Sequence, residues 1–224
     1  MMYFRNRRHA AALLAEKLAR YKGQRPLVLA IPRGAVPMAK IIAEQLEGEM
    51  DVVLVHKLGM PGNPELAIGS VDESGHVYLL EYAHTIDFPD RYISAERERQ
   101  VKTLRERRAR YTPVHPPIDP AGRIVIVVDD GIATGASMMA ALLSIRTKRP
   151  KKIIVATAVA PYDSLQKIQG LTDEVVCLDV PRNFYAVGDF FQEFSQVTDE
   201  EVIDLLRQGR SESEKTKSMS EVSP

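Results

Sequence analysis

The chain has 224 residues with 45% apolar side chains, enough for one substantial core, and its length suits a single α/β domain. Thirty lysines and arginines balance thirty aspartates and glutamates, which argues against a whole-molecule field that would attract nucleic acid or an anionic membrane. The single cysteine, Cys177, excludes a disulfide within the chain and a metal–cysteine cluster. Its apolar neighbours predict a buried, inert thiol.

The N-terminal stretch is basic and then apolar, but Glu16 and Lys17 interrupt it too early for a secretory signal. No segment approaches membrane-spanning length, so we expect a cytoplasmic protein. Residues 6–21 place alanines and leucines near helical spacing. They predict an amphipathic helix that ends before Gly23 and packs as part of a cap.

The next residues predict a strand–loop–helix unit. Residues 27–31 are a short apolar run typical of a buried strand, and residues 38–46 have the composition of a helix. Between them lies the turn PRGAVP at residues 32–37, with a cationic side chain and a glycine. In a parallel sheet with crossover helices, such turns lie at the carboxyl edge, where ligands bind.

The following segment predicts an insertion of less regular structure. A strand over residues 51–58 leads to residues 59–65, which are rich in glycine and proline and predict a loop that can move. Residues 67–80 predict a hairpin that turns at an acidic cluster with glycine. Residues 90–110 predict a long helix in which arginines could suggest an RNA-binding face. Interleaved glutamates and the lack of an aromatic stacking platform favour a solvated helix instead.

The sequence IVIVVDDGIATGAS at residues 124–137 organises the rest of the chain. Its first five residues predict a strand covered on both faces in a parallel sheet, so that Asp129 and Asp130 emerge together at the carboxyl end. The small residues 131–137 let backbone N–H groups converge on an anion. A helix over residues 138–146 follows, and its N-terminus favours negative charge.

Two carboxylates beside a phosphate cradle would repel the phosphate unless they bind hydroxyls or a cation. A ribose 5-phosphate meets both demands: the loop amides bind its phosphate, and Asp129 and Asp130 bind its 2- and 3-hydroxyls. The alternative is an ordinary strand–turn–helix junction with a solvated acidic pair.

The remaining elements complete a mostly parallel sheet of about five strands. Strands are predicted over residues 152–159 and 174–180, with a short helix over 161–168 between them. Residues 181–191 hold four aromatic side chains, which suit a core cluster or one ring that stacks on a planar base. Residues 198–206 begin with a hydroxyl cap and an acidic turn and predict a closing helix.

The domain organisation follows from these elements. Residues 1–207 are predicted to form one domain, with a core over about 24–187 and the insertion over about 58–120. Residues 208–224 lack periodic apolar positions and predict a disordered tail.

The stretch 124–137 resembles the phosphoribosyl pyrophosphate (PRPP) signature of the type I phosphoribosyltransferases: an apolar strand, two acids, then a small-residue loop with Thr-Gly and a hydroxyl residue. The sequence HKLGMPGNPELAIG at residues 56–69 is similar to that of a bacterial uncharacterised subgroup of the same family. The resemblance covers residues 27–187. It implies an α/β fold with a small hood, and Mg²⁺-dependent transfer of a phosphoribosyl group from PRPP to a nitrogenous base with release of pyrophosphate. It also makes a homodimer plausible.

The resemblance assigns roles to individual residues. Asp129 and Asp130 would hold the ribose diol and, mainly through the ligand, the Mg²⁺ ion. Arg33 and Lys57 would stabilise the departing pyrophosphate, together with the loop amides at Gly34, sometimes beside a cis peptide. The expected 5-phosphate loop comprises Ala133, Thr134, Gly135, Ala136 and Ser137.

The late aromatic segment resembles the family's loop over the nucleobase. Phe184 or Tyr185 would cover the base, and Asp189 would assist the metal. His56 could touch the ligand, but a histidine that alternates with apolar residues on a strand favours a structural role. Family members that act on 6-oxopurines commonly carry an aspartate where this chain has Ala133, so a hypoxanthine or guanine acceptor is disfavoured.

Two alternative functions belong to other classes. A sensor would bind PRPP without turnover, but a regulator of nucleic acid should also carry a recognisable binding domain or a concentrated basic face, and the sequence shows neither. A nucleotide-sugar or phosphomonoester hydrolase would need a water-activating base or a nucleophile, which the sequence does not identify.

Overall fold

A computed structural model of the protein describes residues 3–86 and 90–220. Its centre is a five-stranded, fully parallel sheet with the strand order β2-β1-β6-β7-β8. This confirms the predicted fold class. The strands are β1 (Leu27–Ala30), β2 (Glu49–Val52), β6 (Ile124–Asp129), β7 (Lys152–Val159) and β8 (Glu174–Asp179).

Helices cover both faces of the sheet because successive strand residues point to opposite sides. Val28 and Ile126, paired across β1 and β6, face α1 (Arg7–Lys17) and α2 (Val36–Leu46). Their neighbours Leu29 and Val127 face α4 (Ala136–Arg146) on the other side, where α5 (Tyr162–Gln169) also packs. Apolar strands buried on both faces account for the continuous hydrophobic runs in the sequence.

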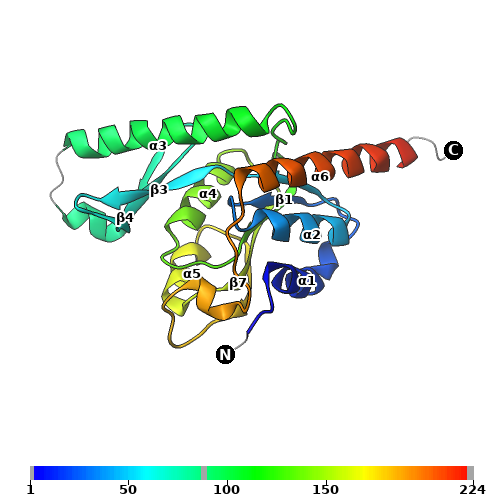
Figure 1. Ribbon diagram of the computed structural model, residues 1–224, viewed down its shortest axis with the longest axis horizontal. Coiled ribbons are helices and arrows are strands. Elements are labelled where there is room, and N and C mark those ends of the chain that lie inside the picture. The colour runs from blue at the N-terminus through cyan, green and yellow to red at the C-terminus, as the bar shows by residue number, and fades with distance from the viewer. Residues whose placement is uncertain (1–2, 87–89, 221–224) are drawn as a thin grey trace.

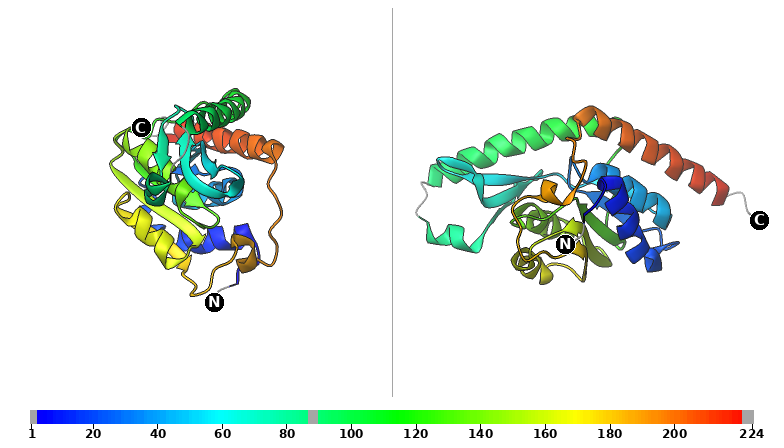
Figure 2. Two further views of the ribbon diagram at one scale, coloured as in Figure 1. Left: turned by 90° about the vertical axis from the view of Figure 1, so that its left-hand side faces the viewer. Right: turned by 60° about the horizontal axis from the view of Figure 1, so that its bottom comes forward.

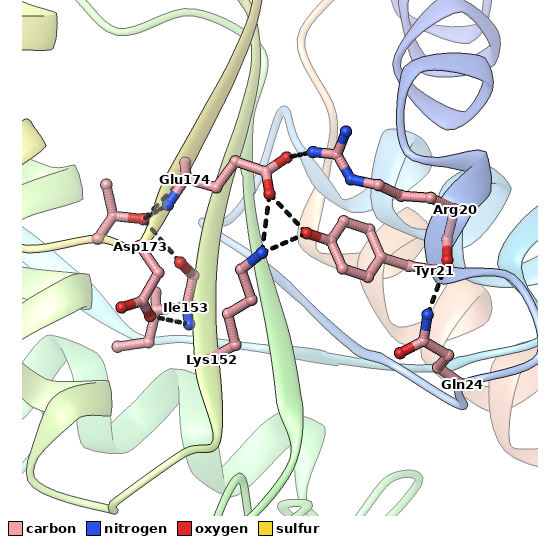
Figure 3. Close-up of polar contacts among 8 residues, drawn as sticks. Arg20, Tyr21, Gln24, Lys152, Ile153, Asp173 and Glu174 are labelled. Atoms are coloured by element: carbon pink, nitrogen blue, oxygen red, sulfur yellow. Dashed lines mark hydrogen bonds and ion pairs between the residues drawn. The ribbon is translucent and has the colours of Figure 1, made fainter.

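A polar cluster ties the short helix η1 (Ala19–Tyr21) to the amino ends of β7 and β8 (Figure 3). The hydroxyl of Tyr21 accepts a hydrogen bond from Lys152 Nζ at 2.6 Å and donates one to Glu174 Oε2 at 2.5 Å. Arg20 pairs with the same carboxylate. Burial opposes ionisation of Tyr21, but the bonds from Lys152 and Arg20 outweigh it and lower the pKa of Tyr21.

The insertion forms a second sheet, which is antiparallel and has the order β3-β4-β5. Its strands are β3 (Val55–Met60), β4 (Asn63–Asp72) and β5 (Val77–Leu79), followed by the short helix η2 (Glu81–Thr85). The long helix α3 (Asp90–Tyr111) packs across β3 and β4, as Figure 1 shows. The predicted hairpin and long helix are confirmed.

Two predictions about the start of the insertion are wrong. The single strand predicted over residues 51–58 is two strands, because the chain leaves the parallel sheet after Val52 and enters the second sheet at Val55. Residues 52–55 are apolar throughout, so hydrophobicity does not reveal the break between the two strands. The predicted mobile loop at residues 59–65 is a paired hairpin, in which Pro61 and Gly62 form the turn and Gly62 adopts a φ of 77°.

The closing helix is longer than predicted. α6 runs over Asp199–Ser220, where the sequence predicted a helix that ends at 206 and a disordered tail from residue 208. Glutamate, lysine, arginine and glutamine favour a helix even without an apolar stripe. α6 follows α3 along one side of the molecule and extends beyond the sheet (Figure 2). Residues 221–224 of the predicted tail lie outside the described residues.

Two smaller findings bear on the sequence predictions. The thiol of Cys177 is only partly buried, and it donates to the carbonyl oxygen of Asp179 at 3.1 Å. Burial raises the pKa of Cys177 to about 11, in keeping with an inert thiol. Among the described residues, no helix has the length and apolar character that crossing a membrane requires.

Candidate active site

The two predicted ligand loops lie side by side because β1 and β6 are neighbours in the sheet, with Ala30 opposite Val128. The peptide bond between Pro32 and Arg33 is cis, as the resemblance anticipates. Gly34 then passes directly over Asp130: a Cβ added at Gly34 would lie closer than 3.0 Å to that carboxylate. Only a glycine permits the loop after β1 to approach the acidic pair so closely.

The acidic pair is held in an environment that opposes its charge. Burial, and next the neighbouring charge of Asp130, raises the pKa of Asp129 well above its usual range. Burial also raises the pKa of Asp130, although Arg7 opposes this effect. A bound cation, or hydroxyl groups that donate to the pair, would offset the cost of ionising the two carboxyls.

Arg7, on the first turn of α1, is a site residue that the sequence did not predict. Its Nε donates to Asp130 Oδ2 at 2.7 Å and its Nη1 donates to the Ser195 carbonyl oxygen at 2.6 Å. Its guanidinium lies 3.9 Å from the centre of the Phe194 ring. The only sequence signal was the basic run NRRH at residues 6–9, which also suits an ordinary helix start.

Backbone pairing brings Arg7 to the site. The N–H of Phe4 donates to the Phe190 carbonyl at 2.8 Å, and the Phe4 carbonyl accepts from Gln192 at 2.9 Å. The N-terminal segment therefore runs beside the segment that follows η3 (Val187–Phe190). These contacts join residues far apart in the sequence, which explains why local patterns did not reveal them.

The predicted 5-phosphate loop leads directly into α4. Gly135 precedes the helix with a φ of 87°, a left-handed conformation that favours glycine. Ala133 and Thr134 are exposed, and Ser137 lies in the first turn of α4. Two hydrogen bonds hold the loop from outside: Ser164 Oγ donates to the Ala133 carbonyl, and Ser70 Oγ donates to the Ala136 carbonyl at 3.0 Å.

The two predicted cationic residues come from different sheets: Arg33 follows β1 of the parallel sheet, and Lys57 belongs to the antiparallel sheet. Arg33 is 37% exposed and its Nη1 lies 3.8 Å from Asp199 Oδ2, at the start of α6. Lys57 lies on β3, paired with Ser70 of β4. Because Ser70 contacts the predicted phosphate loop, the backbone of Lys57 is one strand away from that loop. Burial lowers the pKa of His56, and its Nδ1 lies 2.8 Å from the Lys57 carbonyl oxygen, in keeping with a structural role.

The two base-stacking candidates in the aromatic segment differ in their exposure to solvent. Phe184 is half-buried and stacks on Phe190 of the core, with ring centroids 5.7 Å apart. Tyr185 is 89% exposed, so its ring is accessible. Asp189 is also exposed, within η3. The segment packs on the site through Val187, which lies against Gly131.

The acidic pair fits a magnesium ion that is held jointly with a ligand. Carboxylate oxygens are ligands that Mg²⁺ prefers, and a cation would relieve the repulsion between Asp129 and Asp130. No group of three or more histidine, cysteine or acidic side chains within residues 3–86 and 90–220 is arranged to hold a metal. A ligand would therefore have to supply most of the coordination.

Comparisons with known proteins agree with this geometry. A family model described as a phosphoribosyl transferase domain matches residues 2–192. Two relatives, from the H37Rv and CDC 1551 strains of Mycobacterium tuberculosis, are named "putative phosphoribosyl transferase" and are 37% identical over 207 residues, or 92% of this chain. The chain spans 47% of those proteins, about half their length. The crystal structure of TT1426 from Thermus thermophilus is 46% identical, covers 92% of this chain and 99% of its own, and has a TM-score of 0.80.

The parallel sheet and the two neighbouring loops after β1 and β6 define a phosphoribosyltransferase fold of type I. The chain belongs to the phosphoribosyltransferase family. The resemblance seen in the residues around the acidic pair is confirmed.

Proposed function

We propose that the protein transfers the phosphoribosyl group of PRPP to a nitrogenous base and releases pyrophosphate. The observation that carries this proposal is the acidic pair, which lies between the glycine loop after β1 and the phosphate loop before α4. A ligand with a diol, a phosphate and a pyrophosphate matches these three features together. In this assignment Asp129 and Asp130 bind the ribose diol, and the amides of residues 133–137 bind the 5-phosphate.

The protein would act mainly by positioning the ligand and stabilising charge. Arg33, Lys57 and the Gly34 amide would stabilise the pyrophosphate as its bond to the ribose breaks. Bound Mg²⁺ would neutralise negative charge on the leaving group, with Asp129 and Asp130 as its nearest protein ligands. Tyr185, as the exposed ring, is the better of the two candidates to cover the acceptor base.

The function is tested by incubating the protein with PRPP, Mg²⁺ and a panel of purine and pyrimidine bases. Pyrophosphate release with one of the bases would support the transferase. Ligand-dependent thermal stabilisation without release would instead identify a PRPP sensor, and the absence of both would contradict the proposal. The disfavoured 6-oxopurines belong in the panel because Ala133 stands where their enzymes carry an aspartate.

The acidic pair gives the first prediction. Asp129→Asn combined with Asp130→Asn should weaken PRPP binding by about a hundredfold or more, because two charge-assisted bonds to the diol are lost. Calorimetry measures the affinity. Asp163→Asn, which alters an exposed aspartate on α5, is the matched control and should bind normally. Unchanged affinity in the double variant would contradict the assignment of the site.

A further inference from the structure

The guanidinium of Arg7 is almost buried, with 12% of the side chain exposed, and it is fixed on three sides. Nε is bonded to Asp130, Nη1 is bonded to the Ser195 carbonyl, and the Phe194 ring lies against its plane. A planar guanidinium bound through two nitrogens cannot rotate freely, so the direction of its third nitrogen is also fixed.

That third nitrogen, Nη2, points to the glycine loop after β1. It lies 3.1 Å from the position that a Cβ on Gly34 would occupy. Among the described residues no acceptor bonds Nη2, and the Arg7 side chain keeps part of its surface exposed. A charged donor with a free N–H thus lies between the acidic pair and the loop assigned to pyrophosphate.

We infer that Arg7 is a further PRPP-binding residue, which orients Asp130 through Nε and donates from Nη2 to a pyrophosphate oxygen held at Gly34. This inference rests on the proposed function. The geometry explains why a cation is placed against a carboxylate that must bind a diol: Arg7 holds one carboxylate oxygen and leaves the other to the ribose. A guanidinium is suited to such double use because its donors diverge in one plane.

A purely structural role makes a different prediction. If Arg7 only fastened the N-terminal segment to the site, its loss would weaken all ligands of the acidic pair to the same extent. Ribose 5-phosphate carries the diol and the 5-phosphate of PRPP but lacks the pyrophosphate. Comparing the two ligands therefore isolates the bond from Nη2.

The experiment measures the affinity of both ligands by calorimetry with Mg²⁺ for the wild type, Arg7→Gln and Arg7→Lys. In Arg7→Gln, PRPP affinity should fall by at least about tenfold more than ribose 5-phosphate affinity, the scale of one hydrogen bond between charged groups. Arg7→Lys keeps the charge without the planar fork and should show a smaller difference. Arg8→Gln removes the exposed neighbouring charge on α1 and should match the wild type.

Equal losses for the two ligands, or none, in Arg7→Gln would overturn the inference. Thermal unfolding monitors the fold, and if Arg7→Gln is unfolded then Arg7→Lys carries the same comparison. A wild type that binds neither ligand would overturn the proposed function and this inference together. If the wild type binds PRPP and the Arg7→Gln variant binds it with the same affinity, the inference alone is overturned.

Discussion

Close approaches of the main chain shape the site at single residues. At Gly34 the chain passes over Asp130, and at Gly131 it passes against Val187 of η3. An added Cβ would lie closer than 3.0 Å to its neighbour in both places. The first contact brings the loop after β1, which is predicted to bind pyrophosphate, to the acidic pair, and the second brings the aromatic segment to the same edge of the sheet.

Gly131→Ala should therefore destabilise the protein by about 1–3 kcal/mol, the usual cost of overpacking. Because the clash involves only the Val187 side chain, adding Val187→Ala should restore part of the loss. Chemical denaturation measures both free energies of unfolding. Gly170→Ala is the matched control, since an added Cβ there meets nothing within 4 Å. A Gly131→Ala variant as stable as the wild type would show that η3 moves aside at no cost.

The site residues differ in how far the sequence could predict them. Asp129, Asp130 and the loop over residues 133–137 form one continuous motif, so local patterns indicate them as candidates. Arg7 reaches the site through pairing with a segment near the other end of the domain, and no local pattern records that pairing. The base-stacking role assigned to Phe184 or Tyr185 stays a prediction. The type of ring alone does not show which of the two side chains packs into the core.

At the scale of elements, the hairpin of β4 and β5 depends on one carboxylate. Asp72 lies at the end of β4 and accepts hydrogen bonds from the N–H and hydroxyl of Ser74 and from the N–H of His76. Burial alone would raise the pKa of Asp72, but the bonds from Ser74 and His76 outweigh it, and the pKa is lowered. The ionised side chain thus holds the turn.

This gives a pH-dependent prediction. A carboxyl whose pKa is lower in the folded state contributes stability above its unfolded pKa and loses it as the pH falls through the folded value. Asp72→Asn should cost about 1–3 kcal/mol at pH 7, the range for bonds to a charged group. The difference from the wild type should shrink below about pH 4, where unfolded aspartate is protonated. Denaturation series at pH 7 and pH 3 measure it, and a constant difference would contradict the charge-based account.

Most elements were predictable because their residues repeat with the period of a helix or strand. β7 was predicted to the residue, and α3 within one residue at its end. The predictions that failed concern features that the spacing of apolar residues does not record. An apolar run cannot show where a chain leaves one sheet for another, as it does after Val52. Glycine and proline indicate a turn but not whether the flanking strands pair, as β3 and β4 do.

At the scale of the whole molecule, Asp199 joins three parts of the fold. Its carboxylate accepts hydrogen bonds from Arg110 Nη1 at 3.2 Å and from the Tyr111 hydroxyl at 2.8 Å, and both donors lie at the end of α3. It also lies 3.8 Å from Arg33 of the loop after β1. The start of α6 is thereby linked both to the insertion and to the candidate site. The homodimer and the cytoplasmic location stay predictions.

Asp199→Asn should weaken these links and destabilise the protein by about 1–3 kcal/mol, since bonds to a charged group are lost. High salt should reduce the difference, because the ion pair to the partly exposed Arg33 is screened. Asp204→Asn is the matched control: Asp204 pairs with Arg207 on the exposed side of α6, and the substitution should be nearly neutral. Equal effects of the two substitutions would contradict the linking role of Asp199.

The sheet order has a consequence for how the protein is made. β1 leads into one loop of the candidate site and β6 into the other, yet the entire insertion is synthesised between them. A growing chain on the ribosome holds β1 without its central neighbour until β6 emerges, so the strand must wait with an open edge. The two loops of the candidate site therefore come together only after the insertion has been synthesised, and under the proposed function a chain that stalls within the insertion would not bind the sugar phosphate.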